Sequence, residues 1–341
     1  MSLVDVNVLK TILRPPWRTI VGGALVLIIF FGSYAAWHPG LDIRDGRHDL
    51  GRNGIWLAHG WLGADSWFVE NAKTNELGKF RNPKNIQALA ELLRQHHIKD
   101  VFLHLCPSDP YGNLPEVDNA QTERFLAAFS DFRVMPWIGA PAGPSARTAS
   151  AKWRASFVQS ITNLLNAHPA FAGVQINIEP LSSGDKDFLV LLDQIHAALP
   201  KGKLLSVAAY PPPTRWQPTL EVHWDEKYFH EVAQRCDQMA VMMYDTGVRV
   251  PKIYEHLIAD WTAEALRWSG DKPVLIGVPT YNDAEVGYHN PKVENLRTAL
   301  MGIHKGLGSS PAANYQGVAL YCEWETDENE WSYFQSHFMK Q

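Results

Sequence analysis

Short apolar segments alternate with longer amphipathic stretches over residues 52–341 of this chain. The apolar segments are rich in Val, Ile and Leu, which is typical of strands buried on both faces of a parallel sheet. The predicted strands are residues 54–59, 100–105, 133–138, 173–179, 204–209, 238–244, 273–278 and 316–322. The stretches between them show the spacing of amphipathic helices, predicted at 83–97, 120–129, 149–167, 186–199, 225–236, 254–268 and 292–307, with 329–338 closing the chain.

This alternation predicts the fold class, because eight successive strand–helix units close into a (β/α)8 TIM barrel of about 250 residues. A doubly wound sheet is the alternative, but it usually carries a glycine-rich turn after its first strand. Neither GxGxxG nor GxxxxGK[ST] occurs in this sequence. We therefore predict one barrel domain over residues 52–341, with its active site at the C-terminal ends of the strands.

The N-terminal region is predicted to contain one transmembrane helix. Residues 19–37 carry no charge, and a helix of that length nearly spans a hydrocarbon core of about 30 Å. Trp17 and Trp37 bracket the segment, as interfacial aromatic residues do, and three basic residues precede it. By the positive-inside rule, residues 1–18 are expected in the cytoplasm and the rest of the chain outside it.

This orientation predicts a single-pass protein of the inner (cytoplasmic) membrane, with its barrel in the periplasm or extracellular space. A cleaved signal peptide is the alternative, but its apolar run would be about 7–15 residues, ending at an A-x-A-like site. The polar, glycine-rich segment 38–51 is expected to be a linker between the anchor and the barrel.

Composition excludes several classes of function. The formal charge of −5 argues against a nucleic-acid partner, because phosphate-binding domains are usually strongly basic. Three Cys are too few for a disulfide scaffold and lack the clustered spacing of a zinc site. The 14 His form neither an HExxH motif nor a strand-end HxH, which weakens the alternative of a metal-dependent hydrolase. We expect no metal and no cofactor, with His59 and His104 as hydrogen-bonded residues of the barrel.

The fourth predicted strand ends in polar residues that share one face. Strand alternation places Gln175, Asn177 and Glu179 together, pointing into the barrel. A carboxylate there is costly to bury unless it is paired or functional. Burial should also raise its pKa, as a general acid working near neutral pH requires. Glu179 is therefore the predicted catalytic acid, and a Glu that caps a loop or pairs with a surface Lys is the alternative.

Other strand ends carry polar and aromatic groups that are weak signals singly and specific when taken in order on successive strands. These groups are Trp137 on the third strand, Tyr244 and Asp245 on the sixth, Tyr281 after the seventh, and Tyr321, Glu323 and Trp324 on or after the eighth.

The chain resembles the family-18 chitinase-like glycoside hydrolases at these positions. Their D-G-x-D-x-D-x-E motif falls on residues 172–179 (AGVQINIE), where the glycine and the final acid match and the three aspartates do not. The remaining family motifs are M-x-Y-D, matched in full at 242–245, G-x-P-x-Y, matched at 277–281, S-x-G-G, partly matched at 137–140, and a floor tryptophan that falls at Tyr321. The resemblance spans residues 51–341.

This resemblance implies a retaining glycosidase that cleaves an N-acetylhexosamine-containing polysaccharide or glycan by substrate-assisted catalysis. Glu179 would protonate the leaving oxygen, while the substrate's 2-acetamido oxygen attacks the anomeric carbon with help from Asn177 and Tyr244. Family-18 enzymes carry Asp where Asn177 stands, whereas the family-85 endo-β-N-acetylglucosaminidases, which the chain also resembles here, carry Asn. The residues expected to bind the substrate are Gln175, Trp137, Asp245, Tyr281, Tyr321, Glu323 and Trp324.

Two other functions remain open. In a two-carboxylate barrel glycosidase, Asp245 or Glu323 would act as the nucleophile about 5–5.5 Å from Glu179. In a non-catalytic carbohydrate-binding barrel of an envelope or polysaccharide assembly, no bond would be cleaved. The missing aspartates favour that second function, and the retained Glu179 opposes it.

Tryptophan is unusually abundant, with 13 residues in the chain. Aromatic faces stack on the apolar faces of sugar rings, so Trp residues after strands are candidates for a glycan cleft. The candidates are Trp61, Trp67, Trp137, Trp216, Trp224 and Trp324.

Overall fold

The structure, a computed structural model, describes residues 17–215, 217–283, 285 and 287–340. It divides into two compact units, Met1–Pro39 and Gly40–Gln341. In the first unit, helix α2 (Trp17–Ala36) contains an 18-residue window, Thr19–Ala36, with a mean hydropathy of 2.0. By length and composition α2 can cross a membrane, and a signal sequence near an N-terminus has the same properties. Most of the predicted cytoplasmic segment lies outside the described residues.

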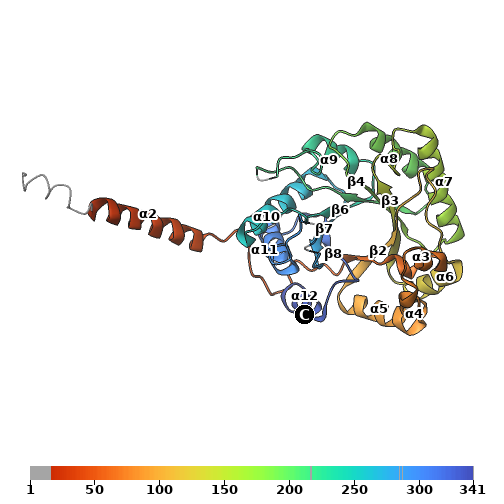
Figure 1. Ribbon diagram of the computed structural model, residues 1–341, viewed down its shortest axis with the longest axis horizontal. Helices are drawn as coiled ribbons and strands as arrows, with labels where there is room; N and C mark the ends of the chain where they lie inside the picture. The colour runs from red at the N-terminus through yellow and green to blue at the C-terminus, as the bar shows by residue number, and fades with distance from the viewer. Residues whose placement is uncertain (1–16, 216, 284, 286, 341) are drawn as a thin grey trace, which may run out of the picture. The chain divides into compact units, whose positions relative to one another are not determined.

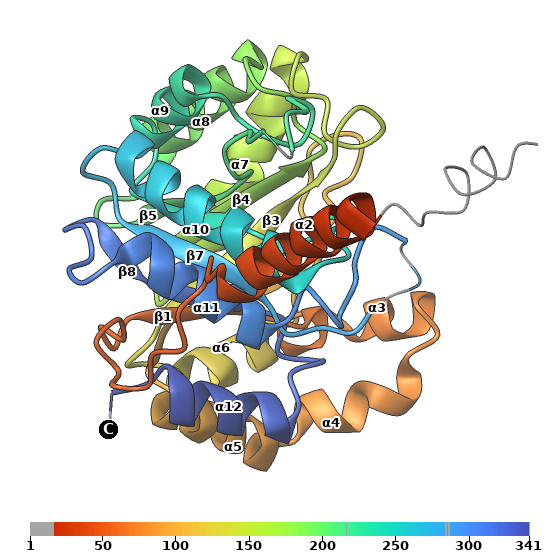
Figure 2. The ribbon, with the colours of Figure 1, turned by 90° about the vertical axis from the view of Figure 1, so that its left-hand side faces the viewer.

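In the second unit, eight parallel strands close into a barrel in chain order, which confirms the predicted TIM barrel (Figure 1). The strands are β1 (Asn53–Leu57), β2 (Ile98–Leu105), β3 (Arg133–Pro141), β4 (Gly173–Glu179), β5 (Leu204–Ala209), β6 (Gln238–Met242), β7 (Val274–Pro279) and β8 (Tyr315–Tyr321). The outer helices, seen from a second side in Figure 2, are α3 (Asp65–Glu70), α4 (Leu77–Arg81), α5 (Pro83–Gln95), α6 (Asn119–Ala128), α7 (Ala151–Ala167), α8 (Lys186–Ala198), α9 (Glu226–Ala233), α10 (Pro251–Trp268), α11 (Leu296–Leu307) and α12 (Glu328–His337).

The sequence pattern and the structure differ mainly between β1 and α5. The short helices α3 and α4, with the 3-10 turns η1 (His59–Trp61) and η2 (Thr74–Glu76), lie where no regular element is predicted. They are too short to show a helical period. Strand β6 ends at Met242, so the last two residues of the predicted strand belong to the loop above it.

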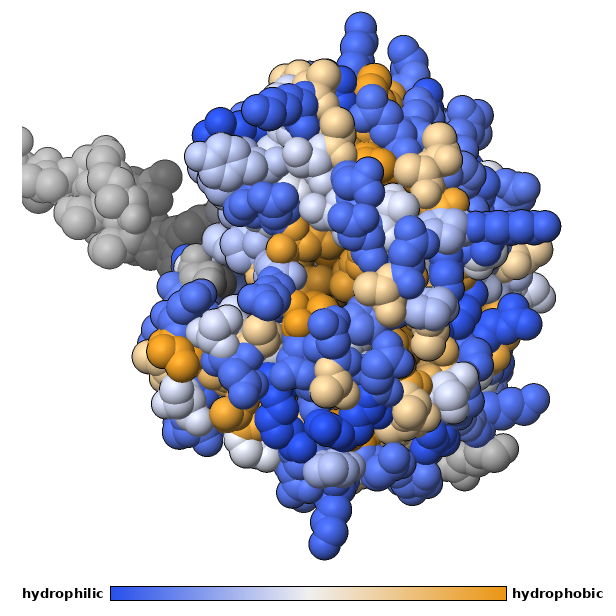
Figure 3. Space-filling view, turned by 90° about the vertical axis from the view of Figure 1, so that its right-hand side faces the viewer, coloured by the Kyte–Doolittle hydropathy of each residue, from blue (hydrophilic) through white to orange (hydrophobic). Residues whose placement is uncertain are grey.

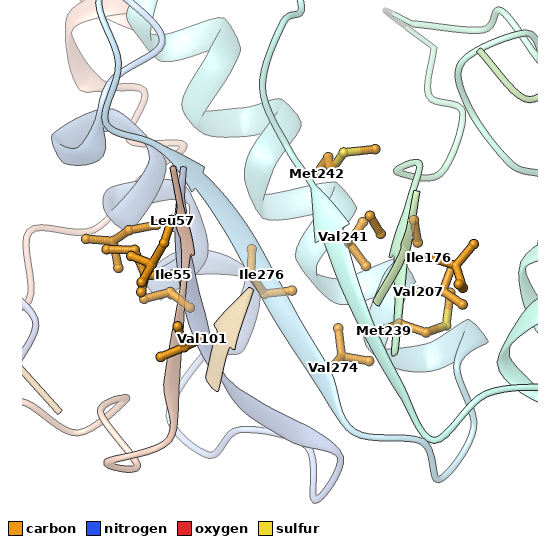
Figure 4. Packing of buried hydrophobic residues seen from close by; sticks show 14 of the residues in the cluster. Ile55, Leu57, Val101, Ile176, Val207, Met239, Val241, Met242, Val274 and Ile276 are labelled. Atoms are coloured by element: carbon orange, nitrogen blue, oxygen red, sulfur yellow. The ribbon is translucent and has the colours of Figure 1, made fainter. Parts of the chain in front are cut away.

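Apolar side chains form two layers, one on each side of the barrel wall. The larger layer lies between the strands and the outer helices, and Figure 4 shows part of it, including Val274 and Ile276 of β7. The smaller layer fills the barrel interior and consists of Trp56, Phe102, Met135, Trp137, Ala240, Leu275 and Ala319. Because side chains alternate along a strand, β1, β2, β3, β6, β7 and β8 contribute to both layers. On β4 the outward side chains are Val174, Ile176 and Ile178, as the pattern predicts.

Polar side chains define the start of most outer helices. The N-cap side chain accepts a hydrogen bond from the backbone of the first turn, which satisfies an otherwise unpaired N–H group. These caps are Asn82, Asp118, Ser150, Asp185, Asp225, Asn295 and Asp327. The caps explain why helices begin close to their predicted positions.

The segment 40–51, predicted as part of a linker, contacts the barrel unit. The Leu41 N–H donates to the Met301 carbonyl oxygen at 2.9 Å. The buried His48 ring lies 2.7 Å (Nδ1 to Nδ1) from that of His304 on α11. These contacts explain why the compact unit begins at Gly40.

The N-terminal end of the barrel is closed by a polar cluster inside the strands. Asp100 of β2 is fully buried and accepts hydrogen bonds from Arg133 of β3, Gln238 of β6 and Gln316 of β8. The distances are 2.6 Å from Arg133 Nη2 and 2.7 Å from Gln238 Nε2. This buried charge is therefore paired with a cation and also hydrogen-bonded, as a buried carboxylate requires.

Candidate active site

The predicted site residues meet at the opposite end of the barrel. Glu179 is the last residue of β4 and Tyr321 the last of β8, while Tyr244 and Asp245 follow β6. Parallel strands in a closed barrel bring these ends to one rim. A cavity of about 480 Å³ lies there, lined by Glu179, Tyr244, Asp245 and residues of neighbouring loops. Figure 3 shows one face of the molecule, where apolar residues line a central hollow within a largely hydrophilic surface.

Glu179 is placed to act as an acid. Burial raises the pKa of its carboxyl group, and the negative charge of Asp245 raises it further. Hydrogen bonds from Asn177 and Tyr210 oppose this shift, because they stabilise the ionised form. The Tyr210 hydroxyl lies 3.5 Å from Glu179 Oε2. A carboxyl group that keeps its proton to higher pH than usual is suited to general acid catalysis.

Asn177 lies on the same face of β4 as Glu179 and lowers the pKa of its carboxyl group. The Asn177 Oδ1 atom is buried without a hydrogen-bond partner among the described residues. The adjacent β3 backbone comes very close, since a Cβ on Gly139 would lie 1.5 Å from the Asn177 carbonyl oxygen. Glycine is therefore required at position 139, and the pairing of β3 with β4 keeps Asn177 in place. The free amide oxygen can accept a hydrogen bond from a ligand.

Gln175 differs from its expected role in substrate binding. It is fully buried, and its Oε1 accepts a hydrogen bond from Trp56 Nε1 at 2.7 Å. Its Nε2 donates to Ser206 Oγ at 3.3 Å. Both ends of the amide therefore hydrogen-bond inside the barrel, to side chains of β1 and β5.

Aromatic rings form a wall of the site. Tyr244 stacks on Tyr321, with ring centroids 5.2 Å apart, and Tyr281 meets both rings edge-on. Trp137 also contacts Tyr321 edge-on, and its Nε1 atom is buried without a partner among the described residues. Trp324 packs against Tyr321 and is 38% exposed. Of these rings, Tyr244 lines the cavity and Trp324 is exposed, so these two can offer a face to a sugar ring.

Asp245 meets two buried residues in a cluster that the sequence does not reveal. The Tyr281 hydroxyl donates a hydrogen bond to Asp245 Oδ1. His289 Nδ1 lies 3.3 Å from the same oxygen and 3.8 Å from Glu294 Oε2. His289 and Glu294 come from the segment between β7 and α11 and belong to no recognisable motif. Asp245, His289 and Glu294 bring one ligand atom each within 4.8 Å of one another, which makes them a candidate metal site.

A second group of polar residues lies near β1 and β2. Glu323 Oε2 is 3.4 Å from both Trp61 Nε1 and the Ala58 N–H group, and burial raises the pKa of its carboxyl group. His59 and His104 face each other at 3.3 Å between their Nδ1 atoms, as expected for hydrogen-bonded barrel residues. Burial lowers the pKa of His59 to about 3 and that of His104 to about 4, so both rings are neutral at ordinary pH.

Three of the Trp residues expected in a glycan cleft, Trp61, Trp137 and Trp224, are buried in the structure. Trp61 and Trp224 are 2% and 1% exposed, and Trp224 Nε1 donates to the Leu181 carbonyl oxygen. Their placement after strands was the only signal, and it does not distinguish a loop that lines the site from one that packs beneath it. Trp67 is half-buried and stacks on His59. Trp216 lies outside the described residues.

Comparison with known proteins agrees with this geometry. The model of the glycosyl hydrolases family 18 matches residues 72–334. The chain is similar in structure to the spore cortex-lytic enzyme SleL of Bacillus cereus, with a TM-score of 0.54 and 12% identity over 85% of this chain and 76% of that one. A chitinase from Chromobacterium violaceum is similar with a TM-score of 0.54 and 15% identity, over 84% of this chain and 100% of that one. A chitinase from Rhizomucor miehei is similar with a TM-score of 0.53 and 10% identity, over 84% of this chain and 99% of that one. No curated protein sequence matches the chain.

The structural similarities, at 10–15% identity, concern the fold alone. The family model extends over more than half of the chain, from the loop after β1 to α12. It includes the β4 end with Glu179, together with the loops that carry Tyr244 and Tyr281. The chain therefore belongs to glycosyl hydrolase family 18, and it is a chitinase-like glycosidase built on a TIM barrel.

Proposed function

We propose that this protein cleaves a polysaccharide or glycan that contains N-acetylhexosamine, by a retaining mechanism in which the substrate's acetamido group is the nucleophile. One observation carries the proposal: Glu179 lines the cavity with a raised pKa, and Asn177, two residues before it on the same face of β4, has an unpartnered amide oxygen. An acid and an amide acceptor side by side are the two groups that this chemistry needs.

The first step breaks the glycosidic bond. Glu179 donates its proton to the leaving oxygen, and its raised pKa supports this role because the proton is retained near neutral pH. The resulting carboxylate then takes a proton from the water that opens the oxazoline ring, so Glu179 acts first as acid and then as base. No second carboxylate is required as a nucleophile.

Asn177 and Tyr244 are proposed to position the acetamido group. The free Oδ1 of Asn177 accepts a hydrogen bond from the acetamido N–H, which turns the acetamido oxygen toward the anomeric carbon. The Tyr244 ring lines the cavity beside Glu179, and its hydroxyl is the proposed donor to that oxygen. Burial and nearby negative charges raise the pKa of Tyr244, so the hydroxyl keeps the proton that it donates.

Helix α2 is proposed to anchor the enzyme in the inner membrane, with the barrel on the exported side. Its uncharged 18-residue window supports this placement, and the basic residues before it set the orientation. Detection of full-length chain in the membrane fraction would support the anchor, whereas a shorter soluble product would indicate a cleaved signal sequence.

Product analysis by mass spectrometry tests the function. Purified protein would be incubated with chitooligosaccharides, with peptidoglycan fragments and with glucans that lack acetamido groups. We expect cleavage of N-acetylated glycans only, and its loss in Glu179→Gln. The matched control is Glu123→Gln, which alters an exposed Glu on the outer helix α6.

Two outcomes would contradict the proposal. Brisk cleavage of plain glucans would indicate a two-carboxylate mechanism. If wild type and Glu179→Gln were equally inert on every N-acetylated glycan while still binding it, the barrel would be a carbohydrate-binding protein.

A further inference from the structure

The cluster formed by Asp245, His289 and Glu294 has a feature that the glycosidase chemistry does not use. His289 is 4% exposed and Glu294 is 0% exposed, so both side chains are removed from water. His289 Nδ1 and Glu294 Oε1 have no hydrogen-bond partner among the described residues. Unpartnered buried polar atoms are rare in folded proteins and require an explanation.

The second ring nitrogen of His289 determines what Nδ1 can do. His289 Nε2 lies 3.1 Å from the Tyr281 carbonyl oxygen, and a carbonyl oxygen can only accept a hydrogen bond. The proton of a neutral imidazole must therefore be on Nε2. The lone pair of Nδ1 then points at two carboxylates, which leaves three electron-pair donors facing one gap.

Such a gap requires a positive charge. Among the described residues, no Lys or Arg forms an ion pair with Asp245 or Glu294, and His289 is their only ion-pair partner. Two carboxylates that face one imidazole, one of them fully buried, are costly unless a cation or a proton balances their charge. A divalent cation at this position would do so.

We propose that Asp245, His289 and Glu294 bind one divalent cation of the Zn²⁺ class at the rim of the barrel. One imidazole nitrogen and two carboxylate oxygens form a ligand set that Zn²⁺ commonly uses, with a fourth position for water. Ligands about 2.0–2.2 Å from a tetrahedral ion are roughly 3.4 Å apart. The 3.3 Å separation of His289 Nδ1 from Asp245 fits, and the 3.8 Å separation from Glu294 needs an adjustment of a few tenths of an ångström.

The surrounding contacts resemble those that orient the ligands of a metal site. A metal-ligating His usually donates its other N–H to a carbonyl or carboxylate, as His289 Nε2 does here. The Thr246 N–H donates to Glu294 Oε2 at 2.9 Å, and the Tyr281 hydroxyl donates to Asp245. The His289 ring also stacks on Tyr281, with centroids 4.0 Å apart. All three ligands are thus oriented before any ion arrives.

A bound ion would connect two loops of the rim. Asp245 and Thr246 follow β6, whereas His289 and Glu294 precede α11. Asp245 also lines the cavity that contains Glu179, so the ion would fix one wall of that cavity. This inference concerns binding alone and stands whether or not the proposed function is correct.

Calorimetric titration with ZnCl₂ tests the site. The full-length chain, solubilised in mild detergent and stripped with a chelator, should bind one Zn²⁺ per protein. Binding of Mg²⁺ and Ca²⁺ should be weaker, because both prefer an all-oxygen set. The melting temperature should rise with Zn²⁺ concentration, since an ion that binds only the folded state stabilises it.

Zn²⁺ binding should weaken by at least about 100-fold in each of three single variants, Asp245→Asn, His289→Gln and Glu294→Gln. Changes to residues that only orient metal ligands usually weaken binding by about 10- to 100-fold. The matched control is His168→Gln. His168 is also buried and contacts a carboxylate, Glu123, but both of its ring nitrogens have partners. This control should keep wild-type affinity.

Circular dichroism melting of each variant separates lost ligands from lost folding, and Asp245→Asn alters the half-exposed member of the set. The proposal is wrong if the wild-type chain binds no stoichiometric Zn²⁺. It is also wrong if folded variants retain wild-type affinity. In either case a second proton on His289 would supply the positive charge.

Discussion

The two ends of the barrel differ in how completely their buried polar groups are hydrogen-bonded. At the N-terminal end, Asp100 accepts hydrogen bonds from Arg133, Gln238 and Gln316, and only Gln238 Oε1 lacks a partner among the described side-chain atoms of that cluster. At the C-terminal rim, Asn177 Oδ1 and Trp137 Nε1 are buried without partners, as are atoms of His59, His289 and Glu294.

This difference separates stability from function. A buried polar group costs free energy unless it is paired, so unpaired groups persist only where something else uses them. In TIM barrels the C-terminal face holds the chemistry, and the N-terminal face contributes to stability. We therefore interpret the hydrogen-bonded cluster at the N-terminal end as a contribution to stability. The unpartnered polar atoms at the C-terminal rim are interpreted as groups that can bind a ligand.

Glu179→Gln is the change with the largest expected effect at the rim. Removing a general acid should lower kcat on an N-acetylated substrate by about 10³-fold, or roughly 4 kcal/mol of transition-state stabilisation. Folding should not suffer. The pKa of Glu179 is raised above its unfolded value of 4.5, so wild type loses stability as pH rises above 4.5 towards the folded pKa. The variant lacks this loss.

Steady-state kinetics and thermal melting at several pH values measure both effects. A variant with normal kcat, or one whose stability fell like that of a core substitution, would break the contrast between the two ends of the barrel.

Asp100→Ala makes the opposite change at the base. It leaves the Arg133 guanidinium without its buried partner and removes one acceptor each from the amides of Gln238 and Gln316. Breaking a buried pair in this way costs about 3 kcal/mol. Denaturant unfolding should show that loss, while kcat of the folded variant changes little. A large drop in kcat at unchanged stability would mean that the base takes part in function.

Asn177→Ala should have an intermediate effect and a distinct pH signature. We expect kcat to fall about 10- to 100-fold, since one positioning hydrogen bond in the transition state is lost. The Asn177 hydrogen bond lowers the pKa of Glu179, so its removal should raise that pKa further. The alkaline limb of the kcat profile should then move to higher pH. A shift to lower pH, or no shift, would show that Asn177 does not contact the ionised carboxylate.

Trp324→Ala should have the smallest effect. Trp324 is 38% exposed and packs edge-on against Tyr321 at the rim. Losing one stacking surface should raise KM a few-fold and leave kcat and stability nearly unchanged. The matched comparison is Trp224→Ala, because Trp224 is 1% exposed and its loss should cost about 3–5 kcal/mol of stability. Similar outcomes for both would remove the distinction between cleft and core tryptophans.

Several local features could be predicted because they depend on short stretches of chain. Strand β4 has its predicted bounds, Gly173–Glu179, since alternation defines its two faces and Pro180 follows it. The loop motifs that carry Tyr244 and Tyr281 were recognisable because each is a compact sequence pattern. The helices α3 and α4 were missed, since five or six residues are too few to show a period.

The sequence by itself determined the order of strands and helices, the apolar helix near the N-terminus and the position of Glu179 at the end of β4. Each of these depends on residues close together in the chain. Only the tertiary structure decided that Gln175 forms hydrogen bonds with Trp56 and Ser206, and that His289 contacts Asp245 and Glu294. Those contacts join different loops and strands, and they form only when the closed barrel brings the strand ends to one rim.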